Sequence, residues 1–165
     1  MTREQFTDAF TPVQEPLRRF LLTLCEGDAF TADDIVQDAC VKAYLACDRF
    51  RGAAKFSTWL FGIAYHCWCD RRYDRRTTDS VDASTIASTV ADDTPADTPS
   101  DTDRHDALYR AIDGLKPNEK AAILLFYMED RSIKEIASIM DIPSGTVRSL
   151  LSRGRSNLKM KLQCK

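Results

Sequence analysis

Apolar residues recur at intervals of three and four along the N-terminal part of the chain, which is the spacing of one face of an α-helix. The first such run is Leu17, Phe20, Leu21 and Leu24. Pro16 directly precedes it, and proline is favoured at the first helical position because its missing N–H has no intrahelical role there. The pattern predicts a helix that begins at Pro16 and ends near Gly27.

Two further helices are predicted before residue 77. Thr31 is the expected N-cap of the first, with Asp33 and Asp34 in the opening turn, where carboxylates complement the helix dipole. The apolar side of this helix comprises Val36, Ala39, Cys40, Ala43 and Cys47. After a break at residues 51–52, Ser57 is the expected N-cap of the next helix. Its apolar side comprises Trp59, Leu60, Ile63, Ala64 and Cys67. No alternation is long enough for a strand, so we expect a small helical bundle.

Residues 77–103 lack this periodicity. They are dominated by Ser, Thr, Asp, Ala and Pro and contain no aromatic residue. Such a segment cannot bury enough apolar surface to offset its ordering entropy, and a flexible coil of this length spans about 30 Å on average and about 90 Å when extended. We therefore expect a first domain at 1–76, a flexible acidic linker at 77–104 and a second domain at 105–165.

Helical spacing returns in the second domain. One helix is indicated by Leu108, Ile112 and Leu115. Pro117 opens another, which carries Ile123, Leu124, Phe126 and Tyr127. Ser132 and Glu135 then form the capping box of a short helix. The inward residues of this short helix are expected to be Ile133, Ile136, Ala137 and Met140.

A longer helix follows the break at residues 141–143, with Ser144 as its expected N-cap and Val147, Leu151 and Leu158 as its buried side. A short helix, a tight turn and a longer helix make a helix-turn-helix, whose second helix enters the major groove of DNA. Arginine can donate two hydrogen bonds to guanine, and Ser and Thr bond bases or phosphates. The outward side chains expected to contact DNA are Ser144, Thr146, Arg148, Ser149, Ser152, Arg153 and Arg155, of which Arg155, with Lys159 and Lys161, is better placed for backbone phosphates.

The net charge of −2 hides an uneven distribution. Residues 1–76 carry 11 basic and 11 acidic side chains, residues 77–108 carry one basic and eight acidic, and residues 109–165 carry 11 basic and six acidic. A neutral block, an acidic spacer and a basic block indicate separate roles. The basic block fits a polyanionic partner, although a solvated helix face would give the same pattern.

The sequence contains no Gly-rich phosphate loop, nucleophile elbow or paired metal-ligand motif, so we expect no enzymatic activity, cofactor, metal or small-molecule substrate. His66, Cys67 and Cys69 suggest a metal or redox site, but helical residues two apart point in nearly opposite directions. There is no signal-peptide core and no apolar stretch long enough to cross a bilayer. We therefore expect a cytoplasmic protein with its six cysteines reduced.

Three motifs resemble those of the extracytoplasmic-function sigma factors, the smallest members of the sigma-70 family. They are ADDIVQDA at 32–39, FRGAAKFSTWLFGIA at 50–64 and the helix-turn-helix at 132–155, and they stand in the order typical of the family. The resemblance covers nearly the whole chain except the linker. It implies an all-α bacterial transcription initiation factor with a sigma region 2-like domain and a sigma region 4-like domain.

The resemblance also assigns roles to individual positions. The surface that docks on the clamp helices of the polymerase β′ subunit would comprise Asp34, Gln37, Asp38 and Lys42. The segment that reads and melts the −10 element, receiving a flipped base, would comprise Phe50, Arg51, Lys55, Phe56, Ser57, Trp59 and His66, although Trp59 is equally explained as a core aromatic. The helix-turn-helix would read the −35 element, and the helices before it would touch the polymerase β flap. The partners implied are core RNA polymerase, promoter DNA and an anti-sigma factor, with the free protein a monomer.

Three positions depart from the family pattern. His66 stands where Asn is frequent near the −10 pocket, and Leu150 stands where a basic residue is frequent in the recognition helix. Gly154 replaces a more typical Ala, which is expected to cost about 1 kcal/mol of helix stability. The first two substitutions mark where promoter preference is expected to differ.

Two other functions remain open from the residues alone. A conventional helix-turn-helix repressor or activator would form stable dimers and bind an operator without help. A structural adaptor would bind only proteins, but it leaves the basic recognition helix unexplained. A sigma factor would instead need core polymerase for tight and specific promoter binding.

Overall fold

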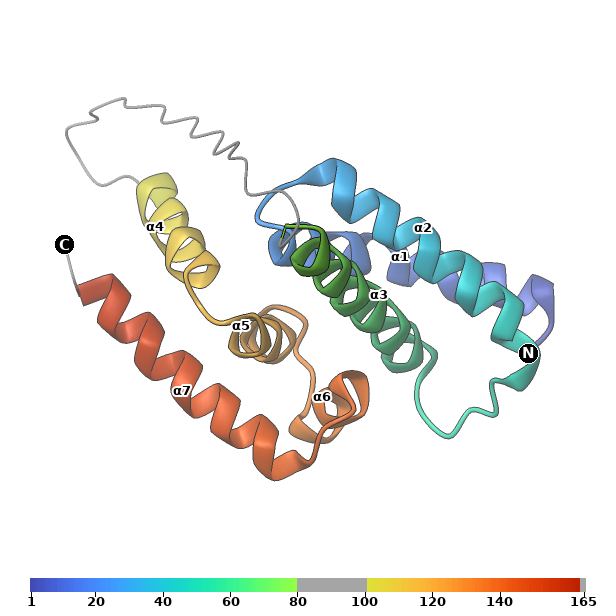
Figure 1. The fold of residues 1–165 in the computed structure, drawn as a ribbon. Coiled ribbons are helices and arrows are strands. Elements are labelled where there is room, and N and C mark those ends of the chain that lie inside the picture. Colours follow the sequence, from blue (N-terminus) through green and yellow to red (C-terminus); the bar gives the residue numbers. More distant parts are fainter. Residues whose placement is uncertain (80–100, 164–165) are drawn as a thin grey trace.

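The computed structural model describes residues 1–79 and 101–163, and these residues form helices and no strand (Figure 1). The first domain comprises α1 (Arg3–Leu24), α2 (Ala29–Ala46), the short 3₁₀ helix η1 (Cys47–Arg49) and α3 (Phe56–Asp79). The second comprises α4 (Asp101–Asp113), α5 (Pro117–Ile123), the π-helix η2 (Leu124–Met128), α6 (Ile133–Met140) and α7 (Ser144–Gln163). The predicted all-α, two-domain architecture is confirmed.

The predicted start of the first helix is wrong, because α1 begins at Arg3 and contains Pro16 in its interior. Thr2 and Gln5 form a capping box at its N-terminus. The early turns are held by Phe6, whose ring packs edge-on against Tyr44 of α2 at 5.5 Å between centroids. Pro12 and Pro16 both lie inside α1, so the helix continues despite the backbone hydrogen bonds that proline removes.

The predicted N-caps of the next two helices are also wrong. Asp28 caps α2 by accepting hydrogen bonds from the backbone N–H of Thr31 at 3.2 Å and from its hydroxyl at 2.6 Å. Asp33 pairs instead with Arg18 of α1 at 2.7 Å. Ser57 lies inside α3, which already begins at Phe56. The turn between α1 and α2 therefore supplies the N-cap of α2, which is Asp28.

A single layer of apolar side chains holds the first domain together. Most residues expected on the apolar sides of α2 and α3 are buried, and Phe61 and Trp68, which the periodicity did not single out, join them. The fully buried members of this core include Leu17, Phe20, Leu21, Ile35, Leu60 and Phe61. Cys40, Trp59 and Ile63 are only half-buried at its edge.

In the second domain the local predictions hold best. Pro117 is at the start of α5, and Ser132 and Glu135 form the predicted capping box of α6. Asp141 ends α6 in the left-handed conformation, with φ at 55°. Ser144 is the first residue of α7 and not its N-cap, because the first-turn amide of Thr146 bonds to the carbonyl of Pro143.

Two residues of α7 are buried where the sequence suggested otherwise. Leu150, which stands where a basic residue is frequent in the family, is 7% exposed and belongs to the core. Gly154 is also buried, where α7 crosses α5. Leu150 therefore does not lie on the exposed face of α7, and its expected effect on promoter preference stays a prediction.

The segment between the domains is described only at its ends. Helix α3 runs to Asp79 and α4 begins at Asp101, so both ends of the predicted 77–104 linker are helical. Residues 80–100, on which the prediction of flexibility rests, lie outside the described residues. None of the helices described is both long and apolar enough to span a membrane.

Candidate nucleic-acid interface

The outward face of α7 is the first element of the candidate site. All seven side chains that the sequence assigned to it are exposed: Ser144, Thr146, Arg148, Ser149, Ser152, Arg153 and Arg155. Val147 and Leu151, both nearly inaccessible, fix the opposite side of the helix against α5 and α6. The outward face is therefore presented rigidly and without cover from the described part of the chain.

The side chains of this face differ in whether they already form hydrogen bonds within the protein. The Ser149 hydroxyl donates to the carbonyl of Gly145 at 3.1 Å, and Arg155 donates to the Tyr127 hydroxyl at 3.2 Å. Arg148 makes no side-chain hydrogen bond or ion pair within the described residues. Arg148 is thus the arginine most available to a base edge, whereas Arg155 is tied back toward η2.

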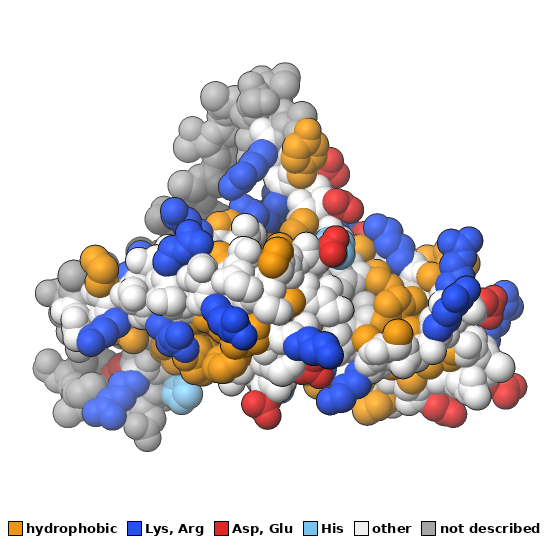
Figure 2. Space-filling model, turned by 90° about the horizontal axis from the view of Figure 1, so that it is seen from below, with side chains coloured by type: hydrophobic (Ala, Val, Ile, Leu, Met, Phe, Trp, Pro, Cys, Tyr) orange, Lys and Arg blue, Asp and Glu red, His pale blue; other side chains and the backbone are white. Residues whose placement is uncertain are grey.

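Basic side chains are spread across the face of the molecule seen in Figure 2, among apolar and a few acidic side chains. Figure 2 looks at the molecule from below Figure 1, where α7 is the lowest element of the second domain, and shows Lys and Arg side chains spread across this face. The α7 helix itself contains basic and neutral residues and no acidic one. Such a surface attracts the phosphate backbone before any base is contacted.

An aromatic cluster at the start of α3 is the second element. Phe50 and Trp59 lie 4.9 Å apart between ring centroids, and Phe56 lies 5.9 Å from Phe50 and 5.8 Å from Trp59. All three rings are half-buried, because Phe56 also packs against Phe6 of α1 at 5.5 Å. The cluster is anchored in the core on one side and accessible on the other, and Trp59 is a half-buried member of it.

The polar residues assigned to the same segment are placed differently. Arg51 and His66 are exposed, with His66 further along α3. Lys55 pairs with Glu135 at 3.4 Å, and the Ser57 hydroxyl accepts a hydrogen bond from Arg131 at 2.9 Å. Two of the assigned side chains are therefore engaged by the second domain.

The exposed face of α2 is the third element. Asp34 and Asp38 both pair with Arg71 of α3, at 3.1 and 2.9 Å, while Gln37 and Lys42 are exposed. Sequence reasoning missed two apolar side chains on this helix, Val41 and Leu45, which are 57% and 74% exposed. Gln37, Val41 and Leu45 follow one another at intervals of four, which places all three on one stripe, and that spacing is the signal that could have found them. Exposed apolar residues beside charged ones are typical of a protein-binding surface.

A further apolar groove crosses the second domain between α4, η2 and α7. It has a volume of about 590 Å³, and Arg155 and Lys159 are its basic lining residues. The apolar residues that line it include Leu108, Ile112, Leu124, Tyr127, Leu158 and Leu162. Sequence reasoning placed several of them on apolar helix faces but missed that they leave a groove open.

The cysteines among the described residues belong to no cluster of metal-ligating side chains. Cys25, Cys40, Cys47, Cys67 and Cys69 are free thiols, and within residues 1–79 and 101–163 no three His, Cys, Asp or Glu residues are grouped to hold an ion. Burial raises the pKa of Cys25 to about 11, so this thiol stays protonated at neutral pH. Cys164 lies outside the described residues.

Comparison with known families gives two matches that together cover both domains. Residues 9–78 match the family model described as Sigma-70 region 2, and residues 105–158 match that described as Sigma-70, region 4. The first match contains the aromatic cluster and the exposed face of α2. The second contains the helix-turn-helix and most of the apolar groove.

Whole-chain comparisons agree with these matches. The chain is 30% identical to the ECF RNA polymerase sigma factor SigW of Bacillus subtilis over 168 residues, which covers 94% of this chain and 90% of that protein. It is 35% identical to the ECF RNA polymerase sigma-E factor of Escherichia coli K12 over 139 residues, which covers 79% of this chain and 73% of that protein.

Two solved structures share the fold. One is the sigma factor RpoE in complex with the anti-sigma factor NepR from Bartonella quintana, with a TM-score of 0.80, 24% identity and coverage of 98% of this chain and 99% of that one. The other is CnrH in complex with the cytosolic domain of CnrY, with a TM-score of 0.69, 20% identity and coverage of 99% and 91%.

Proposed function

Because the chain belongs to the extracytoplasmic-function sigma factors of the sigma-70 family, which direct promoter-specific transcription initiation, we propose how its residues divide that task. The second domain reads the −35 element through α7. The first domain docks on core RNA polymerase through α2 and reads and opens the −10 element at the start of α3. The observation that carries this division is the uncovered basic face of α7, on a helix-turn-helix inside the region 4 match.

At the −35 element, α7 enters the major groove with its N-terminal half toward the bases. Arg148 is the proposed base reader, because its guanidinium is uncommitted and can bond guanine in a bidentate manner. Ser144, Thr146, Ser149, Ser152 and Arg153 complete the contact surface, and Arg155 takes a phosphate at its edge.

At the −10 element, the half-buried rings of Phe50, Phe56 and Trp59 supply stacking surface for a base that leaves the duplex. Unstacking a base costs a few kcal/mol, and aromatic stacking returns about 1–3 kcal/mol per base. Arg51 and Lys55 supply positive charge for the separated strand, Ser57 a hydroxyl, and His66 a donor and an acceptor further along α3.

Two surfaces are proposed to hold the polymerase. The exposed face of α2, with Asp34, Gln37, Asp38 and Lys42, docks on the clamp helices of β′, and Val41 and Leu45 add apolar contact area. The apolar groove of the second domain receives an element of the β flap. The protein would therefore act in the cytoplasm, as a monomer until it joins the polymerase, and without a cofactor or small-molecule substrate.

An anti-sigma factor is the remaining proposed partner. The two solved structures named above were determined with a partner protein, and in the first of them that partner is the anti-sigma factor NepR. Release from such a partner would be the step that makes the protein available to polymerase.

Run-off transcription with purified core polymerase tests this function. The protein is expected to direct initiation from a discrete set of genomic promoters, and Arg148→Ala is expected to reduce initiation there. Protection of a palindromic operator by the protein alone, with no initiation in the presence of core, would instead support a conventional helix-turn-helix regulator.

A further inference from the structure

Two neighbouring pockets that contain basic residues lie between α3 and the second domain. Beside them the Tyr65 hydroxyl of α3 donates a hydrogen bond to the side-chain oxygen of Asn118 at 3.4 Å. Arg72 and Pro117 line both pockets. The two pockets differ in whether their cations already have acidic partners, and this difference indicates which of them can bind an anion.

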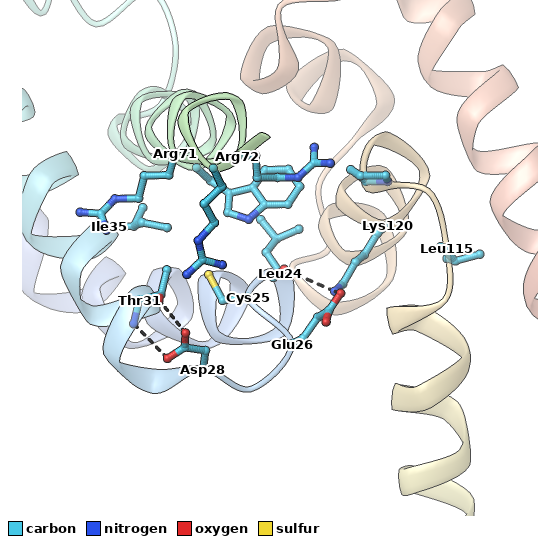
Figure 3. Close-up of a pocket in the computed structure, with 13 residues that line it drawn as sticks. Leu24, Cys25, Glu26, Asp28, Thr31, Ile35, Arg71, Arg72, Leu115 and Lys120 are labelled. Atoms are coloured by element: carbon cyan, nitrogen blue, oxygen red, sulfur yellow. Dashed lines mark hydrogen bonds and ion pairs between the residues drawn. The ribbon is translucent and has the colours of Figure 1, made fainter. Parts of the chain in front are cut away.

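The cations of the first pocket are largely offset by acidic groups (Figure 3). Lys120 is 3% exposed, donates to the carbonyl oxygen of Leu24 at 3.3 Å and pairs with Asp113 at 3.1 Å. Arg71 is held by the two carboxylates of α2 described above. Two acidic residues also line this pocket, Glu26 and Asp28. Little of its positive charge is therefore left for a ligand.

The second pocket, which we call the basic recess, lacks such partners. It has a volume of about 370 Å³, and its basic lining residues are Arg72, Arg76, Lys116 and Arg153. Within residues 1–79 and 101–163 none of these four side chains forms an ion pair. Glu119 is the acidic lining residue, but it is 2% exposed and accepts a hydrogen bond from Asn157 at 3.0 Å. Positive charge therefore exceeds negative charge in the recess.

Arg72 is oriented in the recess by Trp68. Its guanidinium carbon lies 4.9 Å from the centre of the Trp68 ring. Stacking on a ring uses the face of a guanidinium and leaves the N–H groups in its plane free to donate. Burial and the neighbouring Arg76 lower the pKa of Arg72, so its positive charge is poorly stabilised. A bound anion would supply the missing stabilisation.

The other three cations come from both domains. Arg76 lies one turn beyond Arg72 on α3, a spacing at which like charges repel. Lys116 directly precedes α5, and Arg153 belongs to the outward face of α7. All three are exposed, and the hydrogen bond of Arg153 is with the backbone carbonyl of Ser149 at 3.4 Å. Their remaining N–H groups are available to a ligand.

The chemistry of the recess fits linked phosphate groups. Guanidinium groups bond phosphate oxygens in pairs, and lysine adds a point charge. A ligand that faces four cations in a small volume must carry several negative charges close together, as a diphosphate does and a single carboxylate does not. The volume of the recess is in the range of small-molecule sites. Pro117 and Leu150 add apolar lining for an organic part of the ligand.

Duplex DNA is the alternative polyanion. The proposed DNA-contacting side chains lie along one outward face of α7, whereas the cations of the recess come from two domains and line a concave volume. A recess of this size admits a small molecule and not a duplex. We propose that the basic recess binds a small molecule with two or more linked phosphate groups, through Arg72, Arg76, Lys116 and Arg153.

Binding in the recess has a consequence for DNA recognition. Arg153 also belongs to the surface proposed to contact the −35 element, so a ligand that bonds Arg153 would withdraw this side chain from DNA. This consequence rests on the proposed function, whereas the binding of phosphate does not.

Titration calorimetry on the full chain tests the inference, with inorganic pyrophosphate and ADP as probes at about 0.15 M salt. We expect saturable binding of one molecule per chain with a Kd below about 1 mM, and binding of orthophosphate and citrate weaker by about tenfold or more. Tighter binding of ADP than of pyrophosphate would assign the ligand to the nucleotides, and the reverse would assign inorganic pyrophosphate. The inference is overturned if neither probe binds saturably, or if citrate binds as tightly as pyrophosphate.

Substitutions locate the binding site. Arg72→Gln and Lys116→Gln, one in each domain, should each weaken pyrophosphate binding by about tenfold, because each removes a charged hydrogen-bond donor. Lys116 is exposed, so its substitution leaves the core intact. The controls are Arg148→Gln on the outward face of α7 and Lys134→Gln on α6, which are exposed and lie outside the recess. Both should bind pyrophosphate within about twofold of the wild type.

Two further outcomes would overturn the inference. An equal loss in Arg148→Gln and Lys116→Gln would place the phosphates on the DNA-contacting face of α7. No pyrophosphate binding, together with weaker DNA binding by Lys116→Gln, would make the recess part of the DNA-contacting surface. The calorimetry contains neither DNA nor polymerase, so a failure of run-off transcription with intact phosphate binding would count against the proposed function and leave the site in the recess standing.

Discussion

Gly154 of α7 lies so close to Ile123 of α5 that a Cβ at Gly154 would come within 2.7 Å of the Ile123 Cγ1 atom. Helix propensity alone favours Ala over Gly by about 1 kcal/mol. At this crossing the absence of a side chain at Gly154 instead lets α5 and α7 pack closely, and this close packing fixes the position of α7. Gly154, which helix propensity alone disfavours, is therefore the residue that fits between α5 and α7.

Gly154→Ala is therefore expected to destabilise the protein. Overpacking costs about 1–3 kcal/mol, and the gain in helix propensity offsets only about 1 kcal/mol of that. Thermal or urea unfolding followed by circular dichroism measures the change. Gly145→Ala, in the same helix with nothing within 4 Å of the added Cβ, is the control and should cause no comparable loss. Equal effects of the two substitutions would refute the packing explanation.

The same contact predicts non-additive behaviour with Ile123. Ile123→Ala alone should destabilise the second domain by about 2–5 kcal/mol, because it removes a buried side chain. Combined with Gly154→Ala it should cost less than the sum of the two single changes, since the new methyl enters the vacated space. Strictly additive free energies of unfolding would show that the two residues do not share this space.

Arg148→Ala is expected to weaken −35 recognition by about 1–3 kcal/mol and to relax preference at one base pair. The measurement is the affinity of the assembled polymerase complex for a promoter and for its single-base variants in the −35 element. Arg104→Ala removes one exposed charge from α4 and serves as the control. A uniform loss across all promoter variants would make Arg148 a phosphate contact and not a base reader.

Glu135 is predicted to make stability depend on pH. Its hydrogen bond from the Ser132 backbone, assisted by Lys55, holds the pKa of this carboxyl below its ordinary value of 4.5. The stabilisation is thus present at neutral pH and is lost as the pH falls through the lowered pKa. Glu135→Gln keeps a capping side chain but does not titrate. The difference in unfolding free energy between wild type and Glu135→Gln should shrink as the pH falls from about 6 to about 3, because carboxylates titrate over this range.

The exposed face of α2 offers a paired test of polymerase docking. Asp38→Asn should lower affinity for core polymerase by about tenfold, a typical effect for an important interface residue. Arg71→Gln breaks the Asp38 ion pair and the one with Asp34 from α3, but leaves both carboxylates in place. It should have the smaller effect in a direct binding assay. Equal losses would mean that Asp38 acts by fixing α2 to α3.

The sequence predicted best the features that depend on neighbouring residues. The capping box of Ser132 and Glu135 lies within one helical turn, and Pro117 needs only the fixed backbone angle of its own ring. The helix-turn-helix follows from these local signals together with helical periodicity. The outward positions of α7 could therefore be named residue by residue.

The errors are of two kinds: the N-caps assigned to Thr31, Ser57 and Ser144, which are off by a few residues, and packing between segments distant in sequence. The start of α1 depends on Phe6 meeting Tyr44 and Phe56, which the spacing of apolar residues near Pro16 does not reveal. Leu150 has the spacing of a residue at the edge of the recognition face, yet contacts across the second domain bury it.

The contacts between the domains were likewise beyond sequence reasoning. Lys120 reads as an ordinary surface lysine, and only the folded chain places it beside the Leu24 carbonyl. Charged residues are usually exposed, so nothing in their order along the chain distinguishes one that becomes buried at such an interface.

The central claim, that this chain directs polymerase to promoters by reading two elements, is tested most directly by run-off transcription on genomic fragments with purified core polymerase. We predict discrete transcripts that require the protein and that weaken with Arg148→Ala as well as with alanine at Trp59. The absence of specific transcripts with active core polymerase, together with tight operator binding by the protein alone, would contradict the account.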